Sequence, residues 1–250
     1  RKYGFTGVFF IYPSVIMARG RVYRKYYVTR NMIRKLHSLG MEVESHSFYH
    51  PLMHKSSRKD NITQFKYSKK WLEKIVPKKI RFFAYPFGSY TRSTNRMAVK
   101  YGYRGLFSIN NSPVYKGSNE LSINRYMVGR KHSLRVFKLY VNARALRISR
   151  YNPLNGGVYR KIKFISIQLK DNISKQDYRF IALVNGRRAR KYYYNQNKRL
   201  FFFYPRKLYR GLNTVQIILK HKYNRKYPRL ITSWSFVYLK RGKRLARRFR

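Results

Sequence analysis

Residues 1–109 repeat one local pattern, in which an apolar segment typical of a strand is followed by a segment with helical periodicity. Residues 5–12 are rich in Val, Phe and Ile, as interior parallel strands are. Thr29 is placed to cap a helix that ends before Gly40, and a strand at residues 41–45 follows directly. A strand, a helix and a second strand in this order form a parallel crossover, so the pattern predicts an α/β layer or barrel.

The same pattern continues through two more helices. We expect a second helix capped by Asp60 and a third helix at about residues 91–101, closed by Gly102. Strands are predicted after each of them, at residues 81–85 and 105–109. The loops after such strands are where α/β folds place their chemistry.

The sequence changes character near residue 149. A cluster of Asn, Pro and Gly at residues 152–157 is typical of a linker or turn. The segments after it alternate apolar and polar residues without helical rhythm, and Asn185-Gly186 indicates a tight hairpin turn before residues 192–194. These segments predict a small antiparallel β-sandwich, and we expect its Trp234 to lie in the core.

The charge of the chain is strongly unbalanced. Lys and Arg number 59 against 7 Asp and Glu, and the formal net charge is +52. This excess predicts binding to nucleic acid or another polyanion, although it is spread over both halves rather than gathered in one patch. Two alternatives stay open: a surface altered toward positive charge, and a sequence in which acidic side chains are misassigned.

Two further features bound the class of protein. The chain has no cysteine, which excludes disulfides and thiolate chemistry. No run of eighteen apolar residues occurs, so no transmembrane segment is predicted. The first residues do not have the pattern of a signal peptide, and we expect the sequence to open inside a domain.

His46 and His50 are the best candidates for metal ligands. They stand four residues apart just after a predicted strand, and Pro51 follows them. Neutral imidazole is the commonest protein ligand for zinc-like ions, but the spacing alone also fits two hydrogen-bonded loop histidines without a metal. His54 lies beyond Pro51, and we expect it to be exposed.

Four stretches of the chain resemble the polysaccharide deacetylase family, the carbohydrate esterase group with the NodB homology domain. Gly40-Met41-Glu42-Val43-Glu44-Ser45-His46-Ser47-Phe48-Tyr49-His50-Pro51 resembles its second motif, H-[S/T]-x-x-H-P after a Gly-hydrophobic-Glu strand. Phe82-Phe83-Ala84-Tyr85-Pro86-Phe87-Gly88 resembles the third motif, and residues 102–109 resemble the strand after it. Residues 4–11 are similar to the second strand of the family, and the resemblance covers roughly residues 4–146.

The resemblance implies a fold and a domain plan. The fold would be a distorted, partial TIM-like barrel that lacks its first strand and is closed by an amphipathic helix at residues 133–146. Residues 211–215 and 232–237 are similar to the last two strands of bacterial immunoglobulin-like modules. We therefore predict a deacetylase-like (β/α) domain, a linker, an immunoglobulin-like β-sandwich and a basic tail, at residues 1–148, 149–160, 161–240 and 241–250.

The resemblance also implies a chemistry. The protein would remove acetyl groups from N-acetylated amino sugars with the help of a divalent metal, for which zinc is the expectation. His46 and His50 would bind the metal, and the backbone N–H of Phe87 would stabilise the oxyanion. The residues expected to contact the substrate are Tyr85, Pro86 and Arg125.

Several parts of the family pattern are missing or changed. The Asp-Asp pair that supplies the base and the third metal ligand belongs upstream of residues 5–11; either the sequence begins after it or the protein lacks it and is inactive. Ala84 stands where many members have an arginine that orients the base. The late Leu-x-His motif has no clear match, and His132 is a weak substitute for its acid.

Glu44 is the one carboxylate near the histidines that could substitute. Side chains alternate along a strand, so Glu44 and His46 share one side of it. We expect Glu44 to orient His46 rather than to bind the metal, because two neighbours on one strand complete a three-point site poorly.

Three functions therefore stay open. The first is a metal-dependent polysaccharide N-deacetylase acting at the cell envelope or outside the cell. The second is a catalytically inactive deacetylase-like scaffold that joins a surface assembly or holds a glycan, and the third is polyanion binding through charge alone. The aromatic runs at residues 192–194 and 201–204 could stack on sugars or bases, but packing into the core accounts for most of them.

Overall fold

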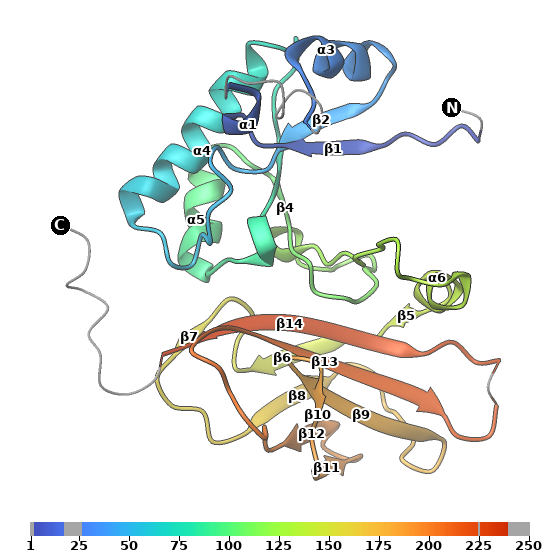
Figure 1. The fold of residues 1–250 in the computed structure, drawn as a ribbon. Coiled ribbons are helices and arrows are strands. Elements are labelled where there is room, and N and C mark those ends of the chain that lie inside the picture. Colours follow the sequence, from blue (N-terminus) through green and yellow to red (C-terminus); the bar gives the residue numbers. More distant parts are fainter. Residues whose placement is uncertain (1–2, 18–26, 225, 240–250) are drawn as a thin grey trace. The chain divides into compact units, whose positions relative to one another are not determined.

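The structure, a computed structural model, describes residues 3–17, 27–224 and 226–239 (Figure 1). The chain forms two compact units, each with its own hydrophobic core. Unit 1 comprises Arg1–Ser108 and Asn119–Ile123, and unit 2 comprises Ile109–Ser118 and Asn124–Arg250. The division falls earlier than the predicted boundary at residue 148. Within the described ranges, no helix has the length and hydrophobicity that a bilayer crossing requires.

Unit 1 contains a parallel sheet whose strands follow the order β1-β2-β3-β4. This order and direction confirm the predicted crossovers and make the unit an α/β structure. The predicted TIM-like barrel stays a prediction, because the four described strands form a row in which only consecutive strands pair. The strands are β1 (Val8–Ile11), β2 (Glu42–Ser45), β3 (Phe82–Ala84) and β4 (Gly105–Phe107).

The prediction that residues 5–12 form a buried interior strand is wrong for most of β1. Val8 and Phe9 are 47% and 40% exposed, and only Ile11 at the end of the strand is buried. Among the described strands, β1 pairs with β2 alone, so it lies at an edge of the row. An apolar run shows that a strand can be buried, but whether it is buried depends on its neighbours.

The helices of unit 1 begin and end at recognisable caps. Thr29 caps α3, as predicted, and Thr91 caps α5; each accepts a hydrogen bond from a backbone N–H of the first turn. Asp60 is not the cap of α4: Ser57 is, and Asp60 bonds back to the backbone N–H of Ser57 in a capping box. The helices are α1 (Ser14–Met17), α3 (Arg30–Ser38), α4 (Arg58–Glu73) and α5 (Arg92–Lys100), with 3-10 turns at Pro86–Gly88 and Glu120–Ser122.

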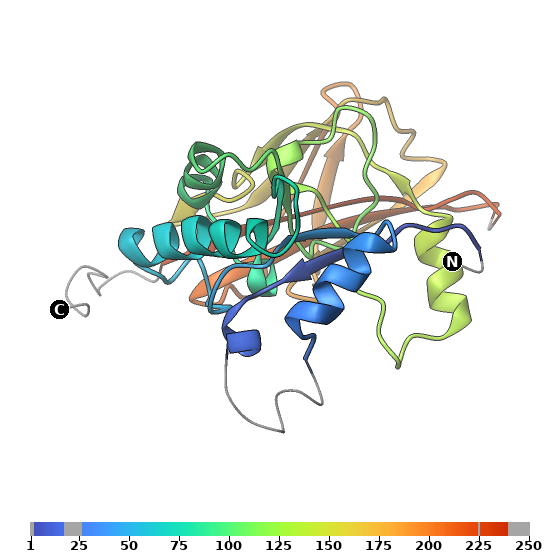
Figure 2. The ribbon, with the colours of Figure 1, turned by 90° about the horizontal axis from the view of Figure 1, so that it is seen from above.

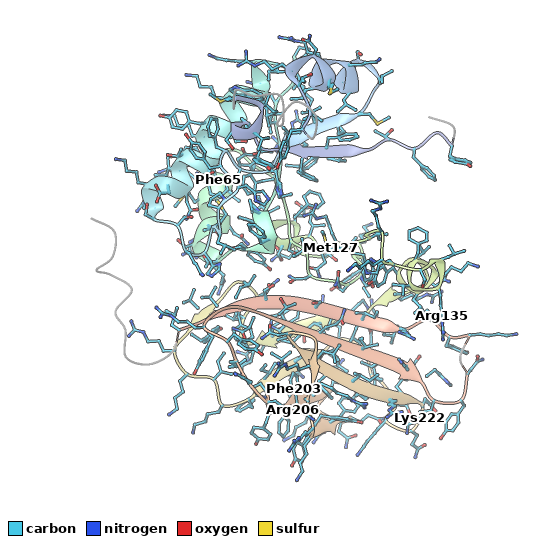
Figure 3. The ribbon with its side chains drawn as sticks, viewed as in Figure 1. Phe65, Met127, Arg135, Phe203, Arg206 and Lys222 are labelled. Atoms are coloured by element: carbon cyan, nitrogen blue, oxygen red, sulfur yellow. The ribbon has the colours of Figure 1, made fainter. Side chains whose placement is uncertain are left out.

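The core of unit 1 lies between its helices and its sheet. Both α3 and α4 contact β2, and α4 also contacts α5 (Figure 2). Phe65 of α4, labelled in Figure 3, is fully buried, and its ring lies 4.8 Å from that of Phe83 on β3. The hydroxyl of Tyr103 donates to the Phe65 carbonyl at 3.0 Å. This packing fixes α4 against the sheet and so fixes the loops between them.

Unit 2 contains two further sheets. One has the order β10-β9-β13-β14-β5, with β7 also paired to β14, and the other has the order β11-β12-β8-β6. All pairs are antiparallel except those of β5 and β7 with β14. The bounds are β5 (Arg144–Ala145), β6 (Ile148–Asn152), β7 (Val158–Tyr159), β8 (Ile165–Leu169), β9 (Tyr178–Val184), β10 (Arg187–Arg188), β11 (Tyr192–Asn195), β12 (Leu200–Phe203), β13 (Gly211–His221) and β14 (Leu230–Tyr238).

The two sheets of unit 2 share one hydrophobic core. Phe203 of β12, labelled in Figure 3, and Trp234 of β14 are both fully buried in it. The Trp234 indole N–H donates to the Pro153 carbonyl at 2.9 Å, which confirms the core position predicted for this residue. An immunoglobulin-like arrangement of the strands stays a prediction.

Three sequence expectations in this half of the chain have mixed outcomes. The Asn185-Gly186 turn is confirmed, with φ values of 50° and 76°, but its hairpin joins β9 to β10 rather than to residues 192–194. Half of the predicted linker at residues 149–160 belongs to β6 and β7, because its backbone pairs with β8 and β14. The helix α6 (Leu134–Val141) falls in unit 2, and the predicted basic tail lies outside the described residues.

Candidate active site

The structure brings the His46 and His50 rings together at the end of β2. Their Nε2 atoms lie 3.2 Å apart, and the ring centroids are separated by 4.8 Å. Nδ1 of His46 donates to the Ala84 carbonyl at 2.7 Å, because a carbonyl oxygen can only accept. In the neutral ring this tautomer makes Nε2 of His46 an acceptor, and it faces Nε2 of His50.

The backbone between the two histidines adopts a shape that few side chains favour. Ser47 and His50 have φ values of 69° and 60°, in the left-handed region. The hydroxyl of Ser47 accepts from the backbone N–H of His50 at 2.9 Å. These local bonds turn the chain back so that the two imidazoles meet, whereas an extended continuation of β2 would hold residues four apart at about 13 Å.

The buried side chain of Gln64, on α4, fixes the backbone of this loop by hydrogen bonds. Its side chain is buried, and its Oε1 atom accepts from the backbone N–H groups of Phe48 and Tyr49 at 3.0 and 2.8 Å. The sequence analysis missed Gln64. The signal that could have revealed it is a polar residue next to Phe65 on the apolar face of a predicted helix.

Aromatic rings surround the histidine pair. The Tyr12 ring centroid lies 4.8 Å from that of His50 and 6.2 Å from that of His46, and the Phe87 ring lies 4.7 Å from His50. Burial and the neighbouring Tyr27 raise the pKa of Tyr12 to about 12, so Tyr12 stays a neutral phenol at pH 7. Burial also lowers the pKa of His50 and so favours the neutral imidazole that a metal requires.

The separation of the two Nε2 atoms fits joint ligation of one ion. Two nitrogens that each lie about 2.0–2.1 Å from a tetrahedral zinc ion are about 3.3 Å apart, close to the 3.2 Å found here. The bond from His46 to Ala84 is the kind of outer support that metal-binding histidines have. Within the described residues, however, no group of three His, Cys, Asp or Glu side chains is placed to hold a metal. His46 and His50 therefore fit two of the ligands of a metal site that needs further ligands.

The role expected for Glu44 is wrong. Its side chain is 1% exposed and accepts from the backbone N–H groups of Arg81 and Phe82 at 2.9 and 2.8 Å. It also forms an ion pair with Lys78, at 3.0 Å. Glu44 thus joins β2 to the start of β3, and the Ala84 carbonyl, not Glu44, orients His46.

The third-motif residues divide between the loop and the core. Phe87 has a φ of 55°, its side chain is 55% exposed, and its backbone N–H donates to no acceptor among the described residues. Tyr85 is fully buried, and its hydroxyl donates to Asn95 at 2.9 Å. Pro86 is buried as well. Direct substrate contact by the Tyr85 or Pro86 side chain is therefore contradicted, because packing covers both.

The remaining candidates lie elsewhere. Arg125 and His132 belong to unit 2, where burial lowers the pKa of the Arg125 guanidinium and Nδ1 of the exposed His132 accepts from the Gly129 N–H. The expectation that His54 is exposed is wrong: it is partly buried, with Nδ1 2.6 Å from the Ser89 hydroxyl. His54 therefore belongs to the packed interior next to the motif loops of unit 1.

Comparison with known proteins bears on this part of the chain. Residues 1–106 match the family model for polysaccharide deacetylase. The matched segment contains both histidines and the Phe87 loop, and it ends well before the limit of residue 146 expected from the motifs. A search of curated proteins gave no significant match.

Solved structures show a related fold. A deacetylase of Streptococcus pyogenes, PplD, in complex with acetate, is 21% identical; the alignment covers 55% of this chain and 59% of that chain, with a TM-score of 0.50. A de-N-acetylase of Aggregatibacter actinomycetemcomitans is 16% identical over 56% of this chain and 66% of that chain, with a TM-score of 0.48. The mixed α/β fold is thus similar to that of PplD, although the chain spans less than two thirds of either protein.

Proposed function

We propose that unit 1 is a metal-dependent polysaccharide N-deacetylase domain. Its substrate would be an N-acetylated glycan of the cell envelope or outside the cell. The observation that carries this proposal is the pair of Nε2 atoms 3.2 Å apart in a sequence motif of the deacetylase family. Two imidazoles held this way by independent backbone bonds are more than the chance meeting of two surface histidines.

The proposed site gives each group a separate task. A bound divalent metal, for which we propose zinc, would polarise the acetyl carbonyl and activate a water molecule. His46 and His50 would hold it through their Nε2 atoms, with Ala84 fixing the tautomer of His46. The Phe87 N–H would donate to the oxyanion that develops on the acetyl group.

The aromatic surroundings fit a sugar substrate. The rings of Tyr12 and Phe87 flank His50, and the exposed Phe87 ring offers an apolar face against which a sugar ring can lie. The neutral phenol of Tyr12 can donate a hydrogen bond beside the histidines. We propose these two residues, in place of Tyr85 and Pro86, as the aromatic walls of the substrate site.

The base and the third metal ligand are not accounted for by the described residues. The family resemblance assigns both tasks to an Asp-Asp pair, and the 250 residues contain no two adjacent aspartates. A deacetylase-like scaffold that holds a glycan or joins a surface assembly without catalysis is the second candidate function. Polyanion binding through the net charge stays a third, untested possibility.

Metal content and activity together separate these functions. We expect zinc to bind in a 1:1 ratio, and His46→Ala or His50→Ala to weaken binding at least about tenfold, since each removes one ligand. His132→Ala, in unit 2, is the matched control. Release of acetate from an N-acetylated oligosaccharide by the zinc-loaded protein would support the enzyme.

Other outcomes point elsewhere. Zinc binding without acetate release would favour the inactive scaffold. Zinc binding that is equal in wild type, His46→Ala and His50→Ala would refute the proposed ligands.

A further inference from the structure

Unit 1 also contains a cavity that the histidine pair does not line. Its volume is about 450 Å³, within the usual range for small-molecule sites. The walls come from the segment after Pro51, from the first turn of α4 and from one side of α5. The residues that line the cavity do not include any to which the proposed deacetylation gives a task.

Three cations line the cavity and have no acidic partner. Arg58 of α4 and Arg96 and Lys100 of α5 belong to its walls, and no Asp or Glu of the described residues does. None of the three forms an ion pair within the part of the chain that the structure describes. Their mutual repulsion would be relieved by a bound anion.

The backbone adds to this positive potential, because two helices begin at the cavity. Thr91 and Ser93 of the first turn of α5 line it, together with Arg58, the first residue of α4. The free N–H groups of a helix N-terminus attract anions. In α4 the carboxylate of Asp60 already bonds to Ser57, whereas the first turn of α5 contains no acidic residue.

Two buried polar atoms on the cavity-lining residues have no partner among the residues that the structure describes. Asn61 is 4% exposed and donates through Nδ2 to the Met53 and Ser56 carbonyls, but no described group donates to its Oδ1. Nε2 of His54 is buried in the same way, with no partner in the described ranges. The Ser89 hydroxyl accepts from the His54 backbone N–H at 3.2 Å and lies 2.6 Å from Nδ1 of the His54 ring.

The cavity therefore offers three cationic side chains and, among the described residues, one buried acceptor without a partner, Oδ1 of Asn61. Buried groups without partners are costly, and a ligand with both acidic oxygens and a hydroxyl would satisfy them. We propose that this cavity binds a phosphate-type anion carried on a sugar, with Arg58, Arg96 and Lys100 facing the charge and Asn61 accepting from a hydroxyl. The inference does not depend on the proposed deacetylase activity.

Calorimetric titration at constant ionic strength tests the site. The probes are N-acetylglucosamine 6-phosphate, inorganic phosphate and N-acetylglucosamine. The variant Arg96→Gln/Lys100→Gln removes two exposed cations from the cavity, and Lys79→Gln/Arg104→Gln removes two exposed cations of the same unit that do not line it. Because all four side chains are exposed, both variants should fold.

We expect the sugar phosphate to bind the wild type and the control alike, and the cavity variant at least about tenfold more weakly, since two charged contacts are lost. If N-acetylglucosamine 6-phosphate and inorganic phosphate each bind, the anion is sufficient for binding. If the sugar phosphate binds and inorganic phosphate does not, the sugar is required as well. If both variants bind the sugar phosphate equally more weakly than the wild type, the net charge of the chain explains the loss of affinity, and the proposed site is overturned. Undiminished binding to the cavity variant would overturn it too.

Discussion

The two units use left-handed backbone for different purposes. Among the described non-glycine residues of unit 1 it occurs at Ser47, His50 and Phe87, in the loops after short strands that carry the candidate chemistry. Among those of unit 2 it occurs at Asn185 and Arg199, in turns between antiparallel strands. Left-handed backbone at a non-glycine residue is unfavourable, so the surrounding structure must stabilise it. Where it lies outside a simple chain reversal, it is a sign of function. Unit 1 therefore holds the candidate site, and unit 2 owes its shape mainly to its core.

The largest effects should come from the two cores. Phe65→Ala and Trp234→Ala each remove a fully buried aromatic ring, and we expect each to cost about 3–5 kcal/mol of unfolding free energy. Urea unfolding measures the loss. If the two units are separate in function as well as in packing, Trp234→Ala should leave zinc affinity unchanged and Phe65→Ala should reduce it. Equal loss of zinc binding in both variants would contradict that division.

A smaller effect is expected at Glu44. Glu44→Gln removes a buried charge that Lys78 and two backbone N–H groups share, at a cost of about 3 kcal/mol. Because Glu44 does not contact His46, zinc affinity should be unchanged at temperatures where the variant is folded. Weaker zinc binding by folded Glu44→Gln would show that the Glu44 carboxylate does take part in the metal site.

Substitution of Gln64, unlike that of Glu44, should lower zinc affinity as well as stability. Gln64→Met leaves the Phe48 and Tyr49 N–H groups without their acceptor, and we expect a loss of about 2 kcal/mol. The loop between the histidines would loosen, so zinc affinity should fall as well. Gln64→Glu, which keeps an acceptor, should recover most of the affinity; failure of this rescue would limit Gln64 to a structural role.

The smallest effect concerns pH. Burial lowers the pKa of His50 and of His54, with a further contribution from Lys55 at His54, from an ordinary value of about 6.5. The unfolded chain then binds more protons below that value, so the stability is fully present above pH 6.5 and declines as the pH falls. Urea midpoints between pH 7 and 5 should decline less in His54→Gln than in wild type. His132→Gln, at an exposed ring, is the control, and identical slopes in wild type and His54→Gln would contradict the effect.

Sequence reasoning succeeded where the determining contacts are local. The cap at Thr29 was predicted because a cap bonds within its own first turn. Asp60 was mistaken for a cap since Ser57 and Asp60 occupy the two ends of one capping box. The pairing of His46 with His50 was predicted from a motif in which the two histidines stand four residues apart.

The errors arose where the partner is distant in sequence. Alternation along β2 placed Glu44 and His46 on one side, but the partners of Glu44 are the N–H groups of Arg81 and Phe82, 37 and 38 residues away. The acceptor for His46 is equally remote, at Ala84. A residue pattern defines the face of a strand, but it does not show which group the fold brings to that face.

The sequence by itself determined the α/β order of unit 1, the strand-rich second half and the two histidines, because periodicity, caps and motif spacing act over a few residues. The tertiary structure alone decided that Tyr85 is buried while Phe87 is exposed, that Gln64 holds the histidine loop, and that three cations meet at one cavity. These features depend on packing between segments far apart in the chain, where burial and hydrogen-bond satisfaction, rather than local preference, select the arrangement.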